Sequence, residues 1–199
     1  MVFGPDGTLY GTTIYGGGGS CLGGCGTVYN LKPPPTACKT ALCPWTETIL
    51  YRFTNGQDGA SPGGDLVFDQ QGNIYGMDFG VANDPGAVYE LTRSGGTWTE
   101  RTLYHFSGGA DGAQPYGGVT FDPSGNIYGV TRVGGAYSLG TVFQLTPSGS
   151  GWTENVLYSF QNGSDGEEPL AGLILDGAGN LYGTSSDGGT GGGVSSNTR

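Results

Sequence analysis

The side chains best placed to do chemistry are aspartates that recur in three similar glycine-rich loops. These loops span residues 55–59, 108–112 and 162–166, and each ends in an Asp-Gly step. Carboxylates in flexible loops suit calcium, which takes several oxygen ligands. One interpretation is therefore a set of calcium loops, with ligands drawn from Asp58, Asp111, Asp165 and Glu167. The other interpretation, which we favour, is an Asp-Gly turn that joins successive strands.

The cysteines form a second group, and all of them lie near the start of the chain. They are Cys21, Cys25, Cys38 and Cys43. An even number in a loop-rich segment predicts two disulfides, with three pairings open. Local pairs close very small loops, so crossed pairs are sterically easier to form. A zinc site is the alternative, but the spacings are looser than in a zinc ribbon and no histidine lies nearby.

Two further features resemble catalytic groups, and neither has the context that catalysis needs. His105 is the one histidine, and it has no recognisable partner as a general base. Residues 59–63 match the Gly-x-Ser-x-Gly pattern, but no helix is expected after the serine. No pair of acids is marked as in a glycosidase. We therefore predict no catalytic residues and a protein that is not an enzyme.

The charge and hydropathy of the chain exclude two classes of partner. The formal net charge is -10, with 7 basic and 17 acidic residues. A phosphate backbone repels such a chain, as does an anionic membrane surface. No apolar run is long enough to span a membrane. We therefore expect neither nucleic-acid binding nor membrane insertion.

These residues must be positioned by a repeated structure, because one short segment recurs along the chain. The copies are residues 73–76, 126–129 and 180–183, with a degenerate copy at 8–11. A period of roughly 54 residues is typical of propellers and repeat arrays. Each repeat contains four β-rich runs bounded by Gly, Asn or Ser, and none shows a helical period.

The sequence thus predicts an all-β fold, and specifically a β-propeller with a partial ring. We expect a single array over residues 1–199. Its four-stranded blades are expected at residues 1–55, 66–106 and 119–160, with a partial blade at 173–185 and a degenerate glycine-rich tail at 186–199.

The fourth run of each repeat alternates between two faces. In the second repeat Trp98, Glu100 and Tyr104 share one face, while Leu103 and His105 belong to the other. The aromatic face is expected to pack on a neighbouring blade, and the other face to be solvent-exposed. A glutamate on the aromatic face needs hydrogen-bond donors, so a structural bond repeated in every blade is expected for Glu47, Glu100 and Glu154.

Taken together, these motifs resemble the GloVer tandem repeat of bacterial "choice-of-anchor" proteins. The motifs are Trp-Thr-Glu at 152–154, Leu-Tyr-Ser-Phe at 157–160, Gly-Thr-Val-Phe-Gln-Leu-Thr-Pro at 140–147 and Leu-Tyr-Gly-Thr at 181–184. The resemblance implies an exported bacterial protein with many repeats and a sorting or anchoring segment. It transfers no activity and no catalytic residue. An insertion at 33–44 and the loss of the pattern after Ser185 indicate a fragment of a longer array.

The function expected from the sequence is binding or adhesion by a secreted or cell-surface module. The expected partner is an unidentified protein or polysaccharide. No cofactor is expected to be required, and calcium is the one that the Asp-Gly loops could hold. The first alternative is a lectin-like or polysaccharide-active propeller whose site lies partly in blades missing from this chain. The second alternative is a structural scaffold.

Overall fold

The computed structural model describes residues 1–34, 43–81, 83–161 and 163–189, and within these ranges it contains strands and no helix. The predicted all-β class is confirmed. The chain divides into two compact units, Met1–His105 and Phe106–Arg199. We name the repeats by their strands: repeat 1 is β1–β4, repeat 2 is β5–β8, repeat 3 is β9–β12, and repeat 4 is β13–β16.

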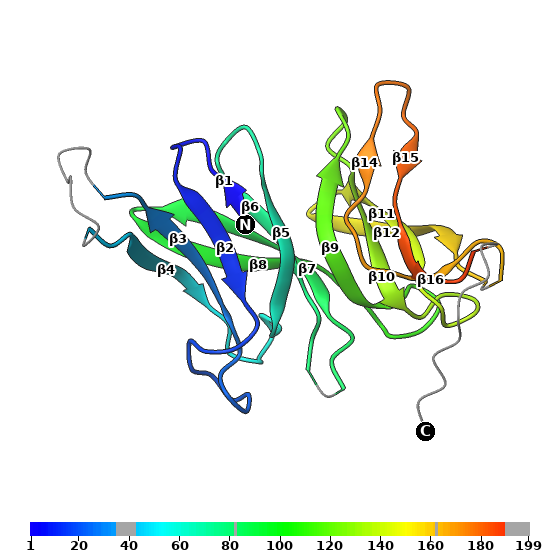
Figure 1. Cartoon of the computed structure of the whole chain (residues 1–199), viewed down its shortest axis with the longest axis horizontal. Helices are drawn as coiled ribbons and strands as arrows, with labels where there is room; N and C mark the ends of the chain where they lie inside the picture. Colours follow the sequence, from blue (N-terminus) through cyan, green and yellow to red (C-terminus); the bar gives the residue numbers. More distant parts are fainter. Residues whose placement is uncertain (35–42, 82, 162, 190–199) are drawn as a thin grey trace. The chain divides into compact units, whose positions relative to one another are not determined.

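The first unit holds repeats 1 and 2, and each is an antiparallel meander of four strands. Repeat 1 comprises β1 (Val2–Phe3), β2 (Leu9–Thr13), β3 (Thr27–Lys32) and β4 (Thr46–Arg52). Repeat 2 comprises β5 (Pro62–Phe68), β6 (Ile74–Asp78), β7 (Ala87–Ser94) and β8 (Thr97–His105). The two meanders lie side by side, with β2 against β5 and β4 against β8 (Figure 1).

The second unit holds repeats 3 and 4. Repeat 3 is a meander of β9 (Ala113–Phe121), β10 (Ile127–Val133), β11 (Thr141–Ser148) and β12 (Gly151–Ser159). Repeat 4 has two short ladders, β13 (Glu167–Pro169) with β16 (Ser185–Asp187) and β14 (Ile174–Leu175) with β15 (Leu181–Tyr182). β14 packs against β9, and β13 packs against β10.

An aspartate fixes the turn before the strand that carries the recurring tyrosine in each repeat, namely β2, β6, β10 and β15. In repeat 2, Asp69 Oδ1 accepts the backbone N–H groups of Gln71 and Asn73 at 2.9 Å each. Gly72 completes the turn at a φ of 84°, which costs a glycine little. In repeat 4, bonds from Asn180 lower the pKa of the equivalent Asp176 to about 2. These aspartates are structural caps.

The first strand of repeat 2 begins at Pro62, earlier than the sequence predicts. The glycines of residues 63–64 indicate a loop, yet they lie within β5, where the register shifts between Gly63 and Val67. A Cβ on Gly63 would collide with the ring of Phe79. Glycine inside a strand often marks a bulge or a close approach, and here it marks both.

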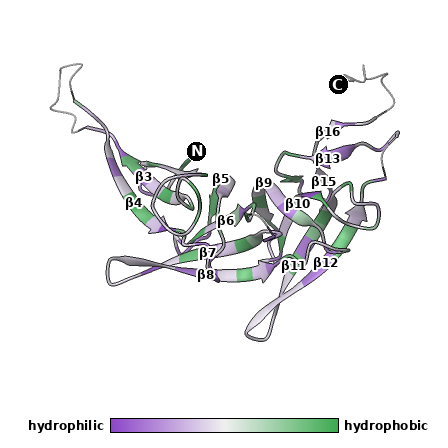
Figure 2. Ribbon diagram, turned by 90° about the horizontal axis from the view of Figure 1, so that it is seen from below, coloured by the Kyte–Doolittle hydropathy of each residue, from purple (hydrophilic) through white to green (hydrophobic). Residues whose placement is uncertain are grey.

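The fourth strands of repeats 1, 2 and 3 each carry a bulge that the alternating pattern does not reveal. The register shifts leave one leucine unpaired in each meander, namely Leu50, Leu103 and Leu157. In β8, Trp98 and Glu100 are half-buried while Thr99 and Arg101 are exposed, as expected. Leu103, however, is only 8% exposed, so its expected place on the solvent face is wrong. Leu103 is the unpaired residue of the bulge, so its side chain is not held to the alternation of the paired residues. Figure 2 shows hydrophobic and hydrophilic residues along the same strand, as in β7 and β8.

Aromatic side chains at the ends of the fourth strands pack on the third strand of the next repeat. Phe53 is fully buried, and its ring lies edge-on to Tyr89 with centroids 5.1 Å apart. In the second unit Phe106 packs on Phe143 in the same way, also at 5.1 Å. Edge-to-face pairs of this kind add to the stability gained by burying the rings.

In the part of the chain that the structure describes, no helix is long and apolar enough to cross a membrane.

Candidate functional site

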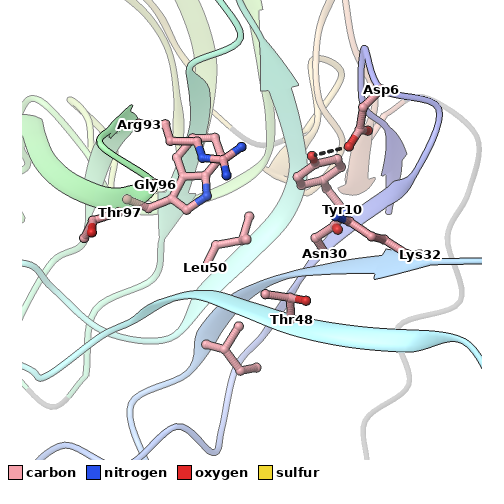
Figure 3. Close-up of a pocket in the computed structure, with 11 residues that line it drawn as sticks. Asp6, Tyr10, Asn30, Lys32, Thr48, Leu50, Arg93, Gly96 and Thr97 are labelled. Carbon is pink, nitrogen blue, oxygen red and sulfur yellow. Dashed lines mark hydrogen bonds between the residues drawn. The ribbon is translucent and has the colours of Figure 1, made fainter.

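The best-formed candidate site is a polar pocket between repeats 1 and 2 in the first unit (Figure 3). Its volume is about 310 Å³. We call it the Trp98 pocket, and its lining comprises Asp6, Tyr10, Asn30, Lys32, Thr48, Ile49, Leu50, Arg93, Gly96, Thr97 and Trp98. β2, β3 and β4 supply one wall, and the hairpin between β7 and β8 supplies the other.

The hairpin wall presents an aromatic ring and a cation together. Arg93 and Trp98 are direct cross-strand partners on β7 and β8. The guanidinium carbon of Arg93 lies 5.9 Å from the centroid of the Trp98 ring, within range of a cation–π interaction. Trp98 also packs against the hydrophobic cluster of the unit. These contacts hold the indole and the guanidinium in place before any ligand binds.

The opposite wall is open because repeat 1 has a short side chain where its neighbours have longer ones. In repeat 2, Glu90 accepts a hydrogen bond of 2.6 Å from Tyr75, and in repeat 3 Gln144 donates one of 2.8 Å to Tyr128. Asn30 occupies this position in repeat 1 and instead donates to the Leu9 carbonyl at 3.1 Å. The ring of the equivalent tyrosine in repeat 1 therefore lines the pocket.

The carboxylate in the pocket already has donors of its own. Asp6 accepts bonds from the Thr8 hydroxyl at 2.8 Å, the Thr8 N–H at 3.0 Å and the Tyr10 hydroxyl at 3.1 Å. Burial raises the pKa of Asp6, but the donors on Thr8 and Tyr10 outweigh it, so the pKa lies below its usual value. Asp6 is therefore ionised at neutral pH.

The two cations of the pocket are not neutralised within the described residues. The ion pairs between described residues are Met1 with Asp65, His105 with Asp84, and Arg132 with Glu168. Neither Lys32 nor Arg93 takes part in them. Lys32, Arg93 and Asn30 were not predicted as site residues from the sequence. The available signal was their departure from the repeat, since Thr146 and Pro147 stand where Lys32 and Arg93 would align.

The aspartates of the Asp-Gly loops bond to their own loops. Asp58 accepts hydrogen bonds from Thr54 N–H, Thr54 Oγ1, Gly56 N–H and the Tyr51 hydroxyl, at 2.7 to 3.1 Å. Asp111 accepts from Ser107, and Asp165 from Gln161 and Tyr158. Such bonds are those of a structural turn.

The structure divides the predicted calcium ligands between the two units. Asp58 lies in the first unit, whereas Asp111, Asp165 and Glu167 lie in the second. Glu167 is in β13, paired with Asp187 of β16. Among the described residues, no group of three His, Cys, Asp or Glu side chains is arranged to hold a metal ion.

Two of these aspartates, Asp58 and Asp111, each have a glutamate of the following repeat nearby. Asp58 and Glu100 both line an open hollow of about 530 Å³. Burial and, to a smaller extent, the charge of Asp58 raise the pKa of Glu100 to about 7, although the hydrogen bond from Thr102 acts to lower it. Burial and then the charge of Asp111 likewise raise the pKa of Glu154 to about 7.

The expected structural bond is not repeated at these glutamates. Glu100 accepts a 3.0 Å bond from Thr102 on its own strand, whereas Glu154 Oε1 has no partner among the described residues and Glu47 is exposed. The reason is that Val156 in repeat 3 replaces Thr102 and removes the donor.

The cysteine pairing is local. Cys21 and Cys25 form a disulfide, with Cα atoms 5.0 Å apart. The pairing that the sequence left open is thus decided for these two cysteines, and it is a local one. The glycine-rich loop folds back on itself through bonds from Gly16 to Gly23 and from Cys25 to Gly18, which bring the two cysteines together. Cys43 is also disulfide-bonded, while Cys38 lies outside the described residues.

Two residues that resemble catalytic groups have structural contacts. His105 Nε2 lies 3.1 Å from Asp84 Oδ1, a partner that the sequence did not reveal. Ser61 has a φ of 60°, and Gln114 and Glu168 at the equivalent positions have φ values of 54° and 49°. The left-handed backbone at Ser61 thus belongs to the repeat and not to a nucleophile turn.

The model of the Gloeobacter/Verrucomicrobia repeat matches residues 1–195, a range that includes the Trp98 pocket and all three Asp-Gly loops. No curated protein matches the chain.

Proposed function

Because the chain belongs to the Gloeobacter/Verrucomicrobia repeat family, as its motifs predict, we propose that it is a non-enzymatic binding module exported from a bacterial cell. Its ligand site is the Trp98 pocket. The observation that carries this proposal is the convergence of an indole ring with the polar groups of Asn30, Lys32 and Arg93 in one pocket. Pockets that combine an aromatic surface with a few placed polar groups are typical ligand sites.

The saccharide alternative is the form of binding that the pocket favours. A tryptophan presents a flat apolar surface to the C–H face of a sugar, and an N–H to its hydroxyls. Asn30, Thr48 and Thr97 add donors and acceptors around the ring. We therefore propose a polysaccharide segment as the ligand.

One observation supports binding as the function in place of catalysis, and a second supports export in place of a cytosolic location. The pocket has one carboxylate in its lining, whereas glycoside hydrolysis uses two. The disulfide between Cys21 and Cys25 fits an oxidising compartment outside the cytosol.

We further propose that the repeats are blades of a β-propeller. The support is the four-stranded antiparallel meander of each complete repeat, together with the side-by-side packing of repeats 1 and 2 within the first unit. The pocket would then lie between neighbouring blades.

A glycan array tests the proposed function, with Trp98→Ala as the variant and Trp45→Ala as its control. Trp45 is the tryptophan of repeat 1 that is equivalent to Trp98. It is 48% exposed and does not line the pocket. We expect the wild-type chain and Trp45→Ala to bind one sugar class and Trp98→Ala to lose it. Absence of binding by the folded wild-type chain would favour the scaffold.

The same array, run with calcium and with a chelator, tests the calcium loops. The nearness of Asp58 to Glu100 in one hollow favours a cation there. The ligand site would lie in the loops and not in the pocket if a chelator abolished sugar binding and Asp58→Asn weakened it. Trp98→Ala would then leave binding unchanged.

A further inference from the structure

Resting on the proposed function, we propose that the Trp98 pocket selects an acidic polysaccharide, with the carboxylate of one uronic acid unit held between Lys32 and Arg93. The proposal concerns the chemical class of the ligand and not its location.

The distribution of charge is the first argument. The chain has 7 basic and 17 acidic residues, yet two of the basic ones line a single pocket. Both lack an ion-pair partner among the described residues. Two like charges brought to one pocket repel each other, and an anion between them removes that repulsion.

The net charge of the pocket indicates how many charges the ligand carries. Asp6 is ionised, and its oxygens accept bonds from Thr8 and Tyr10. The two cations and this one carboxylate leave a single positive charge in the pocket. One carboxylate on the bound sugar unit neutralises it, whereas a doubly charged unit would meet repulsion from Asp6.

The geometry of the hairpin wall supplies the third argument. A guanidinium binds a carboxylate through two parallel N–H bonds, and it is weakly hydrated compared with an ammonium. Arg93 is already held by the indole ring of Trp98 at 5.9 Å, so little side-chain freedom is lost on binding. A sugar unit that contacts the exposed part of the indole would bring its ring carboxylate within reach of the Arg93 guanidinium.

The repeats themselves supply an internal comparison. Repeat 3 keeps the tryptophan, as Trp152, and the tyrosine, as Tyr128. It has Thr146 and Pro147 at the positions of the cations and Gln144 at the position of Asn30. The cationic pocket therefore comes from residues in which repeats 1 and 2 depart from the repeat, and the repeated structure does not require it.

The test compares two probes with the same sugar chain, namely the anionic oligogalacturonate and its uncharged, fully methyl-esterified form. We expect the full-length wild-type chain to bind the acid form at least about tenfold more tightly than the ester, measured by titration calorimetry. Lys32→Met and Arg93→Gln should each weaken acid binding by about tenfold and weaken ester binding by a smaller factor, so that the preference for the acid form falls.

Two control variants keep the result specific to the pocket. Arg101→Gln removes the same charge from an exposed position on β8 outside the pocket, and it should leave both affinities unchanged. Asn30→Gln keeps the charge but supplies the longer side chain of repeat 3, and it should weaken both probes. Thermal melts and circular dichroism establish that each variant is folded.

The outcomes separate this proposal from the proposed function. Equal binding of acid and ester that still depends on Trp98 would overturn the acidic class and leave saccharide binding intact. The acidic class would also be overturned if Arg101→Gln and Arg93→Gln lost the same amount of affinity for the acid form. The cations of the pocket would then have no special role. Failure of the folded wild-type chain to bind either probe would overturn the acidic class as tested here, and a blank glycan array would overturn the proposed function with it.

Discussion

Repeats 2 and 3 fill the same buried position with different chemistry. In repeat 3 the end of the second strand pairs Thr131 with Thr141, and their hydroxyls lie 2.8 Å apart. In repeat 2 the equivalent cross-strand pair is Asp78 with Ala87, and both side chains are buried. Repeat 1 agrees with repeat 3, since its two threonine hydroxyls are 2.9 Å apart.

The exchange leaves a carboxyl group that is not fully satisfied. Asp78 Oδ1 accepts the Gly80 N–H at 3.0 Å, but Oδ2 has no partner among the described residues. Burial, and then the charge of Asp84, raises the pKa of Asp78 well above its usual value. The comparison shows that the backbone of the repeat tolerates a changed pair, while the cost depends on whether the new polar atoms find partners.

The largest effect is expected when the pair of repeat 2 is placed in repeat 3. Thr131→Asp with Thr141→Ala would bury a carboxyl without its hydroxyl partner. We expect the free energy of unfolding to fall by roughly 3 kcal/mol near pH 8, because an unpaired charge is costly to bury. Urea unfolding monitored by tryptophan fluorescence measures it. A loss below about 0.5 kcal/mol would show that the position is not buried as described.

The reverse exchange should stabilise repeat 2. Asp78→Thr with Ala87→Thr restores the hydroxyl pair of the other repeats and removes the unsatisfied carboxyl. We expect a gain of roughly 1–2 kcal/mol near pH 8. Asp78→Thr alone is the control, and it should gain less because its hydroxyl lacks the partner at position 87. A destabilised double variant would contradict the comparison.

The pH dependence of stability should follow the same carboxyl. Because the folded pKa of Asp78 lies above its unfolded value, the native state binds more protons, and stability falls as pH rises from about 4. Glu100 and Glu154, with pKa values of about 7, act in the same direction between about 4.5 and 7. Asp176, with a pKa of about 2, acts oppositely, so its stabilisation is lost at more acid pH.

Thermal melts at fixed ionic strength between pH 4.5 and pH 8.5 measure this profile. We expect the wild-type melting temperature to decline across the range, and the Asp78→Thr, Ala87→Thr variant to decline less. Parallel profiles for the two proteins would rule out Asp78 as a source of the decline.

The smallest effect is expected at the edge of the same region. His105 Nε2 lies 3.1 Å from Asp84 Oδ1 near Asp78, and the His105 side chain is 47% exposed. His105→Ser, the residue of repeat 3, should lower the free energy of unfolding by less than about 1 kcal/mol. Urea unfolding measures it, with Arg101→Gln as an exposed control on the same strand. A larger loss would mean that the contact of His105 with Asp84 organises the loop.

Much of the fold could be predicted because its signals are local. The turn at Asp69 needs residues only four positions apart, and the strand alternation of Trp98 and Glu100 reads directly from the sequence. The bulge at Leu103 could not be predicted in this way, since a single extra residue is invisible until the strand is paired with β7. The early start of β5 was hidden by glycines that resemble a loop.

The candidate site was harder to predict for the same reason. Its cations are far apart in the sequence, with Lys32 on β3 and Arg93 on β7. Each is an unremarkable surface residue until β4 packs against β8 and brings the two meanders together. The aspartates that the sequence emphasised bond instead to their own loops.

The sequence by itself determined the repeat, the β-class, the hairpin turns and the family, because each depends on residue types at short, recurring spacings. Only the tertiary structure decided the Cys21–Cys25 pairing, the burial of Asp78 and the convergence of Lys32 and Arg93 on one pocket. These depend on which side chains meet when a loop folds back or two meanders pack. The spacing of residues along the chain does not show which of these side chains come into contact. The packing of the folded chain decides those contacts.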